Sequence, residues 1–166
     1  VSLPYFNKFS EDYATYTLGR KITTTFNIPL NYVKQGNLPK LLSELAKRNI
    51  VPTLIFNNPR PEEAENIGKL VKEAIDTQTD STFKAKIKIA ISNEPNGLTG
   101  AAYIRGGSAF AKALKLFADA CGGSCQNIYL PALTIAGNDL VNQGHAFVKD
   151  FWSEIRRNQG GRLPTN

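Results

Sequence analysis

The stretch IVPTLIFNNPRPEEAENIGKLVKEAIDTQ, residues 50–78, decides the fold class of this chain. Its first part, residues 50–58, is rich in β-branched and aromatic side chains and predicts a strand. Pro61 then marks the first turn of a helix, and the glutamates that follow it favour the positive end of that helix. The predicted buried face of this helix consists of Ala64, Ile67, Val71, Ala74 and Ile75. A strand followed directly by a helix is a βα unit.

The same alternation continues on both sides of this unit. Further strands are predicted over residues 23–32, 86–93 and 127–135, and further helices over residues 37–49, 103–120 and 138–158. The first 22 residues are interpreted as a strand at 2–6 and a helix that begins at Ser10. Since hairpin signals are missing, the pattern predicts parallel strands joined by right-handed crossovers. The chain is therefore expected to be a single α/β domain, residues 1–166, of about five βα units.

Two architectures satisfy this pattern. One is the first part of an eight-unit (β/α)8, or TIM, barrel, which normally needs about 250 residues. The other is a complete open, doubly wound sheet of five strands. The periodicity of the sequence does not choose between them.

Composition narrows the range of partners. Of the 166 residues 42% are apolar and 20% are charged, as in an ordinary globular protein. No apolar run approaches the ~20 residues of a membrane span, so we expect no membrane span. The formal charge is +6, but the basic residues are scattered and the densest runs, around Lys86 and at Arg156-Arg157, are short. We therefore expect no nucleic-acid binding. Attraction to an acidic polysaccharide or another negatively charged surface is compatible with the charge.

The two cysteines, Cys121 and Cys125, lie in the segment ACGGSC. The glycines and the serine between them would allow so short a loop to close into a disulfide, and two free thiols are the alternative. A disulfide favours an oxidising compartment and hence a secreted protein, and the opening residue Val1 fits a processed chain. A zinc site is not expected, because the single histidine, His145, lies 20 residues beyond the second cysteine.

Polar residues end the predicted strands. They are Tyr32, then Asn57 and Asn58, then Asn93 and Glu94. Because function gathers at the carboxyl ends of parallel strands, amides and hydroxyls there suit a polyhydroxylated ligand. No glycine-rich phosphate loop follows a strand, since the glycine pair of YIRGGSA follows a loop, and no cofactor is expected.

Glu94 is the acidic residue of most interest, because it terminates a predicted strand whereas most others lie on predicted helix faces. A carboxylate held by a rigid sheet in a partly desolvated cleft has the raised pKa that a general acid needs. Pro95 favours extended backbone at Glu94, and Asn93 is placed to bind a substrate hydroxyl. The alternative is that Asn-Glu-Pro-Asn-Gly is merely a turn, since it is rich in turn-forming residues.

The segment ISNEPNG, residues 91–97, resembles the clan A glycoside hydrolases, whose (β/α)8 barrels carry Asn-Glu-Pro at the end of the fourth strand. If residues 2–6 are the first strand, this chain has the motif at the same place. The resemblance implies that Glu94 is the general acid/base and that Asn93 contacts the sugar. It makes Asn57, Asn58 and Tyr32 cleft residues by position only. The specific part of the likeness covers residues 92–96, and the rest is the general βα rhythm.

The chain also departs from this family. A retaining glycosidase needs a second carboxylate about 5–5.5 Å from the first, and the family supplies it from the seventh strand. Only Asp139 among the other acidic residues is expected near the same edge, where an N-capping role suits it better. The chain is thus expected to need further strands, from a second chain or from another copy, before it hydrolyses an oligo- or polysaccharide. The alternative is a non-catalytic carbohydrate-binding or self-associating structural protein.

Overall fold

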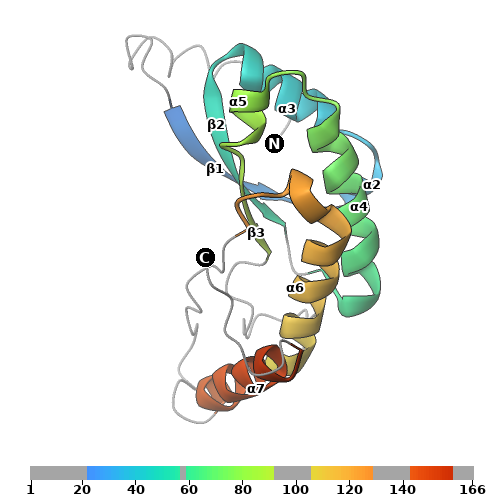
Figure 1. The fold of residues 1–166 in the computed structure, drawn as a ribbon, viewed down its shortest axis with the longest axis vertical. Coiled ribbons are helices and arrows are strands. Elements are labelled where there is room, and N and C mark those ends of the chain that lie inside the picture. The colour runs from blue at the N-terminus through green and yellow to red at the C-terminus, as the bar shows by residue number, and fades with distance from the viewer. Residues whose placement is uncertain (1–21, 57–58, 92–105, 129–142, 159–166) are drawn as a thin grey trace.

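The computed structural model describes residues 22–56, 59–91, 106–128 and 143–158 of the chain (Figure 1). Their framework is a parallel sheet in the order β1-β2-β3, formed by Ile22–Ile28, Ile50–Phe56 and Lys88–Ile91. Ile28 of β1 lies opposite Phe56 of β2, which in turn lies opposite Ile91 of β3. The predicted α/β class with parallel strands is therefore confirmed for this part of the chain.

The helices alternate with the strands as the sequence predicts. Between β1 and β2 lie α2 and α3, between β2 and β3 lie α4 and α5, and α6 and α7 follow β3. Their bounds are Leu30–Lys34 (α2), Leu38–Lys47 (α3), Pro61–Asp76 (α4), Ser81–Lys84 (α5), Gly107–Cys121 (α6) and Gln143–Asn158 (α7). A short 3-10 helix, Gly122–Ser124, continues α6. None of the helices in the described ranges is long and apolar enough to cross a membrane.

Two predicted strands are shorter than expected. The strand predicted to run to Tyr32 ends at Ile28, because Pro29 has no N–H with which to continue the ladder and instead precedes α2. The strand predicted from Lys86 begins at Lys88, because the residues before it form α5 and a turn. The helix α5 was not predicted, and its N-cap is Asp80, whose side chain accepts a hydrogen bond from the Phe83 amide at 3.0 Å.

One further strand pairing extends the sheet. Ile128 forms a parallel bridge with Ile89 of β3, and the Ile89 amide donates to the Asn127 carbonyl at 2.9 Å. This is where the strand predicted over residues 127–135 begins. The remainder of that prediction, and the strand and helix predicted before residue 22, lie outside the described residues.

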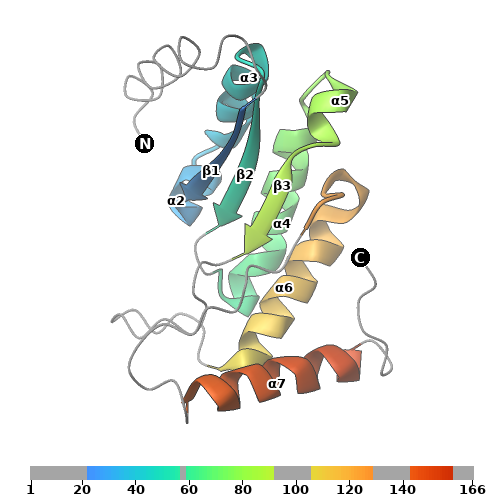
Figure 2. The same ribbon diagram turned by 90° about the vertical axis from the view of Figure 1, so that its left-hand side faces the viewer.

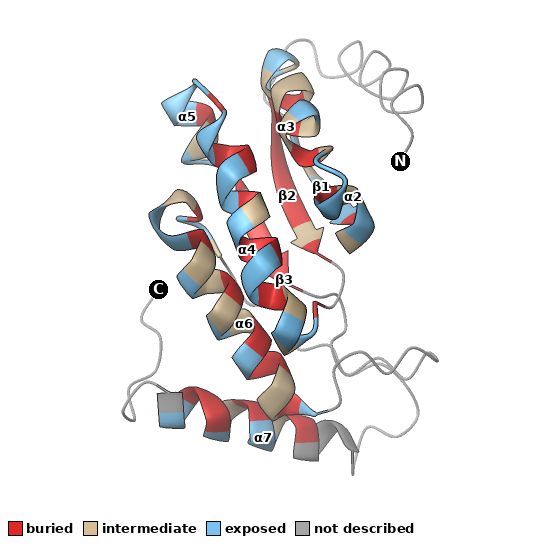
Figure 3. Ribbon diagram, turned by 90° about the vertical axis from the view of Figure 1, so that its right-hand side faces the viewer, coloured by how far each residue is buried: buried red, intermediate tan, exposed pale blue. Residues whose placement is uncertain are grey.

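The described helices cover one face of the sheet. Figure 2 shows the strands in front and α3, α4 and α6 behind them, and Figure 3 shows the same helices from the other side. Alternate strand residues, among them Ile28, Leu54 and Ile89, belong to one buried apolar cluster with residues of α3, α4 and α6. The predicted helix face of residues 61–76 is confirmed, because all five of its apolar members are buried.

The last helix, α7, crosses α6 near the start of α6 and does not lie alongside it (Figure 2). Phe147 and Phe151 of α7 pack on Phe110 of α6, with ring centroids 6.1 and 5.5 Å apart. The two backbones approach so closely that a Cβ on Gly107 would lie 1.9 Å from the Phe147 carbonyl oxygen. The glycine pair at 106–107 therefore permits a helix crossing, and no residue with a side chain fits at its second position.

Candidate functional site

The carboxyl edge of the sheet is formed by the last residues of three neighbouring strands, Ile28, Phe56 and Ile91. All three are buried in the apolar cluster. The predicted site residues Asn57, Asn58, Asn93 and Glu94 lie outside the described residues, and so does Asp139. The described strands show only how soon these residues follow a strand end in the sequence. Asn57 follows Phe56 directly, and only Ser92 and Asn93 separate Glu94 from Ile91.

Tyr32 is the one predicted cleft residue whose surroundings are described. It lies in α2, one turn beyond the end of β1, and its half-buried ring packs against the apolar cluster. Burial raises the pKa of the Tyr32 phenol above its ordinary value of 10.0, so the side chain is neutral at physiological pH. Its structural task is packing, and its role toward a ligand stays a prediction.

The sequence analysis missed Asn27. Its neighbours Phe26 and Ile28 pack against the helices, so Asn27 lies on the opposite face of the sheet, where it is exposed. It is the last residue of β1 on that face and lies beside Ile55 of β2. The signal that would have found it is Pro29, because a strand ended there places Asn27, and not Tyr32, at the carboxyl edge.

We call the face of the sheet on which no described helix packs the helix-free face. Its residues, by strand alternation, are Thr23, Thr25, Asn27, Val51, Thr53, Ile55, Lys88 and Ala90. One row across the three strands consists of Thr25, Thr53 and Lys88. In a closed barrel this is the face that would line the interior.

A buried carboxylate lies where α7 meets α6. Glu154 of α7 is 5% exposed and accepts a hydrogen bond from the Ser108 hydroxyl at 2.9 Å, while Arg157 pairs with the same carboxylate oxygen. The N-cap of α6 is Gly106, which has no side chain to satisfy the first turn. Glu154 therefore supplies negative charge at the positive end of α6 from a different helix. Its partners mark it as a structural residue, which single-helix reasoning did not anticipate.

The predicted disulfide between Cys121 and Cys125 is present, with the two Cα atoms 5.6 Å apart. It closes the turn at the end of α6, and both cysteines are buried. Within that turn the Ser124 hydroxyl donates to Asp76 of α4 at 2.6 Å. Lys72 and then Ser124 lower the pKa of the Asp76 carboxyl below its ordinary value by hydrogen bonding to it. The described residues contain no cluster of three side chains that would hold a metal.

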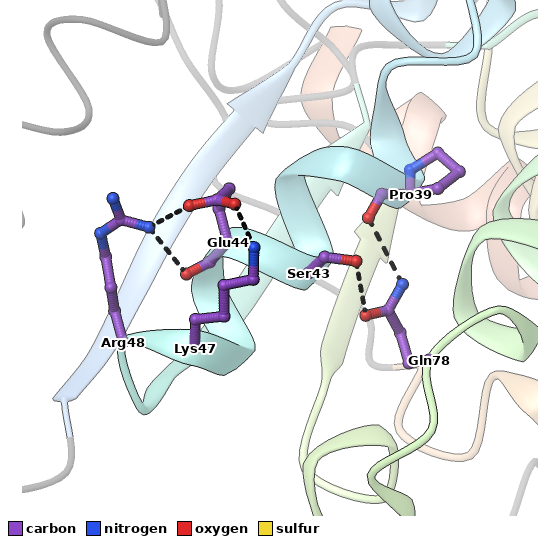
Figure 4. Close-up of polar contacts among 6 residues, drawn as sticks. All are labelled: Pro39, Ser43, Glu44, Lys47, Arg48 and Gln78. Carbon is purple, nitrogen blue, oxygen red and sulfur yellow. Dashed lines mark hydrogen bonds and ion pairs between the residues drawn. The ribbon is translucent and has the colours of Figure 1, made fainter.

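The polar contacts of α3 are structural as well (Figure 4). The buried Gln78 accepts a hydrogen bond from the Ser43 hydroxyl at 3.3 Å and donates to the Pro39 carbonyl at 3.4 Å, which joins the end of α4 to α3. At the other end of α3, Glu44 pairs with both Lys47 and Arg48. Hydrogen bonds from Lys47 and then Arg48 lower the pKa of Glu44 to about 2.

Comparison with known proteins gives no relative, because no family model, curated protein or solved structure matches the chain.

Proposed function

We propose that this chain is part of a glycosidase-like (β/α) barrel that acts on oligo- or polysaccharides, with Glu94 as the general acid/base. The observation that carries the proposal is the end of β3 at Ile91, because Asn93 and Glu94 follow it in the sequence by two and three residues and β3 is paired with β2. A carboxylate so soon after a paired strand is expected near the carboxyl edge of the sheet, and Pro95 favours extended backbone at Glu94.

The arrangement of the described elements favours a barrel over a doubly wound sheet. The strands follow one another in the order β1-β2-β3, and the described helices lie on one face (Figures 1 and 2). Right-handed βα units that always step in the same direction place every helix on the same face, as in a barrel. A doubly wound sheet reverses its strand order and covers both faces with helices.

The chemistry proposed for this edge is acid-catalysed cleavage of a glycosidic bond. Glu94 donates its proton to the leaving oxygen as the carbon–oxygen bond breaks, and a water oxygen finally forms the new bond to that carbon. Asn93 binds a hydroxyl of the same sugar, and Asn27, exposed at the end of β1, is a further candidate for hydroxyl binding. A second carboxylate is needed as nucleophile or base, and we propose that strands supplied by another chain or copy carry it.

A second candidate function is polysaccharide binding without cleavage, in a secreted or structural protein. The orientation of α7 is the observation against a continued barrel and hence against a complete catalytic site, because α7 crosses the start of α6 and does not extend the row of helices that flanks the sheet. In addition, the one carboxylate that is buried among the described residues, Glu154, is already paired with Ser108 and Arg157. In this version Glu94 remains a binding residue and turnover is absent.

The test compares wild-type protein with Glu94→Gln on a panel of polysaccharides, measuring reducing ends and binding in parallel. The matched control is Glu73→Gln, which removes an exposed carboxylate of α4. Hydrolysis that disappears in Glu94→Gln and persists in Glu73→Gln is the result expected of a glycosidase, with a loss of at least about 100-fold for a general acid. Binding without hydrolysis would support the second candidate, and the absence of both would contradict the two proposals together.

A further inference from the structure

Three lysines lie at or just before the amino end of β3, whereas Glu94 follows its carboxyl end in the sequence. Lys84 ends α5, Lys86 lies in the following turn, and Lys88 opens β3. We call these three residues and the backbone between them the basic turn. In Figure 2 it lies between the label α5 and the tail of the β3 arrow. Lys86 and Lys88 are exposed and Lys84 is half-buried.

No carboxylate of the described residues forms an ion pair with the lysines of the basic turn. Lys34, Lys47, Lys69, Lys72 and Lys115 each form an ion pair, but Lys84, Lys86 and Lys88 form none with the carboxylates of the described residues. The carboxylate of Asp76 is close enough for Lys84 to contribute to its lowered pKa, yet it is already bound by Lys72 and Ser124. Three positive charges thus lie close together in the sequence with no ion-pair partner among the described residues, in a chain whose net charge is +6.

Hydrogen bonds from other parts of the fold hold the basic turn in place. The side-chain amide of Asn127 donates to the Ala85 carbonyl at 2.7 Å and to the Ile87 carbonyl at 3.4 Å. The backbone carbonyl of Asn127 accepts from the Ile89 amide at 2.9 Å. On the other side, Asp80 caps α5. A turn fixed at both ends presents its lysines without the cost of ordering its backbone on binding.

The position of Asn127 also connects the basic turn to the disulfide. Cys125 lies two residues before Asn127, so the Cys121–Cys125 bridge stabilises the segment that clamps the turn. A disulfide is typical of proteins in oxidising, extracytoplasmic surroundings, where carboxylated and sulfated polysaccharides are common polyanions. The nearest aromatic residue in the sequence, Phe83, is buried and offers no face on which a nucleic-acid base would stack.

We propose that the basic turn is a binding surface for an acidic polysaccharide, distinct from the edge at which Glu94 is predicted to act. Lysine ammonium groups attract carboxylate or sulfate groups as mobile point charges, which suits a repeating polymer better than a single shaped ligand. The proposal concerns described residues alone and does not depend on Glu94.

The test measures binding of the full chain to polygalacturonate and to heparin oligosaccharides, with a neutral glucan and duplex DNA as comparison ligands. The variant is the triple substitution Lys84→Gln, Lys86→Gln and Lys88→Gln. Its control is Lys40→Gln, Lys112→Gln and Lys149→Gln, three exposed lysines on α3, α6 and α7 that form no ion pair with a described residue. Both variants lower the net charge by the same amount, so they separate the position of the charge from its total.

We expect the basic-turn variant to bind the acidic polysaccharides about tenfold or more weakly, and the control variant to lose less than about threefold. Binding of the wild type should weaken as salt rises from about 50 to about 200 mM. The single substitution Lys86→Gln lies in an exposed turn and is expected to weaken binding of the acidic polysaccharides only in part. It tests the proposal even if the triple variant does not fold.

Equal losses in the two triple variants would overturn the proposal, because total charge would then explain the binding. So would equal affinity for the neutral glucan, or tighter binding of duplex DNA than of either acidic polysaccharide. Loss of hydrolysis in Glu94→Gln tests the glycosidase proposal, whereas the difference in binding between the two triple lysine variants tests the basic turn, so a failure of one and a failure of the other are distinguishable.

Discussion

At the scale of single residues, the described charged side chains are chiefly structural. Glu44, paired with Lys47 and Arg48, has its pKa lowered from 4.5 to about 2. Glu154 balances the start of α6, and Asp76 joins α4 to the disulfide turn. Each carboxylate is explained by neighbours that help to hold a helix in place. Perturbed carboxylates in this part of the chain are therefore no guide to a catalytic centre, although such groups often mark one.

The low pKa of Glu44 makes a prediction about acid stability. Because its pKa is lower in the folded state than the ordinary 4.5, the Glu44 pair stabilises the protein above that pH, and the contribution is lost as the pH falls from 4.5 through about 2. At neutral pH the wild-type protein should have a modestly larger free energy of unfolding than Glu44→Gln, because a pair near the surface contributes little. The two free energies should converge as the pH falls to about 2.

Urea unfolding across this pH range measures the difference, and Glu73→Gln serves as the control. An NMR titration of the Glu44 carboxyl carbon with a midpoint near 4.5 would contradict the prediction.

At the scale of elements, the sequence patterns located helices better than strand ends. The apolar spacing in α3 and α4 is long and regular, so their buried faces were predictable. The end of β1 was misplaced because the apolar and aromatic run continues past Pro29, where the ladder stops. The helix α5 has four residues, too few for a periodic pattern, and its cap at Asp80 was its only sequence signal.

The crossing of α6 by α7 makes a prediction at this scale. Gly107→Ala places a methyl group 1.9 Å from the Phe147 carbonyl oxygen, so either α7 must shift or the contact must open. We expect a loss of about 1–3 kcal/mol in the free energy of unfolding, or more. The control is Gly123→Ala, because nothing lies within 4 Å of a Cβ at that position, and it should change stability by less than about 0.5 kcal/mol. Equal urea midpoints for the two variants would show that the helices do not approach so closely.

At the scale of the whole molecule, the described sheet has an incomplete surface. Among the described residues β1 has a strand neighbour on one side only, and Thr23, Thr25 and Asn27 are exposed on the helix-free face. A partial barrel leaves such edges and faces to be covered by other strands. This is the physical reason for proposing that further strands, from outside the described residues or from a second chain or copy, complete the sheet.

Native mass spectrometry of protein purified from its source tests this expectation. We expect a native mass larger than that of the denatured polypeptide that contains this sequence, and denaturation should release either further copies of that polypeptide or a second one. A second polypeptide with a glutamate at a strand end would strengthen the case for hydrolysis, whereas a homo-oligomer would favour binding or a structural role. A single chain under native conditions would contradict the proposal that another chain or a second copy completes the barrel.

The sequence by itself determined the α/β class, the alternation of the described strands with helices except for α5, and the buried face of α4, and it favoured the Cys121–Cys125 bridge, because each depends on residues close together in the chain. Only the tertiary structure decided that the described helices share one face, that α7 crosses α6 at Gly107, that Glu154 reaches Ser108 and that Asn127 clamps the basic turn. The contacts of Gly107 with Phe147, Ser108 with Glu154 and Ala85 with Asn127 join residues between 40 and 46 positions apart in the sequence. No local sequence pattern encodes such pairings. They arise because packing and hydrogen bonding are satisfied across the whole fold.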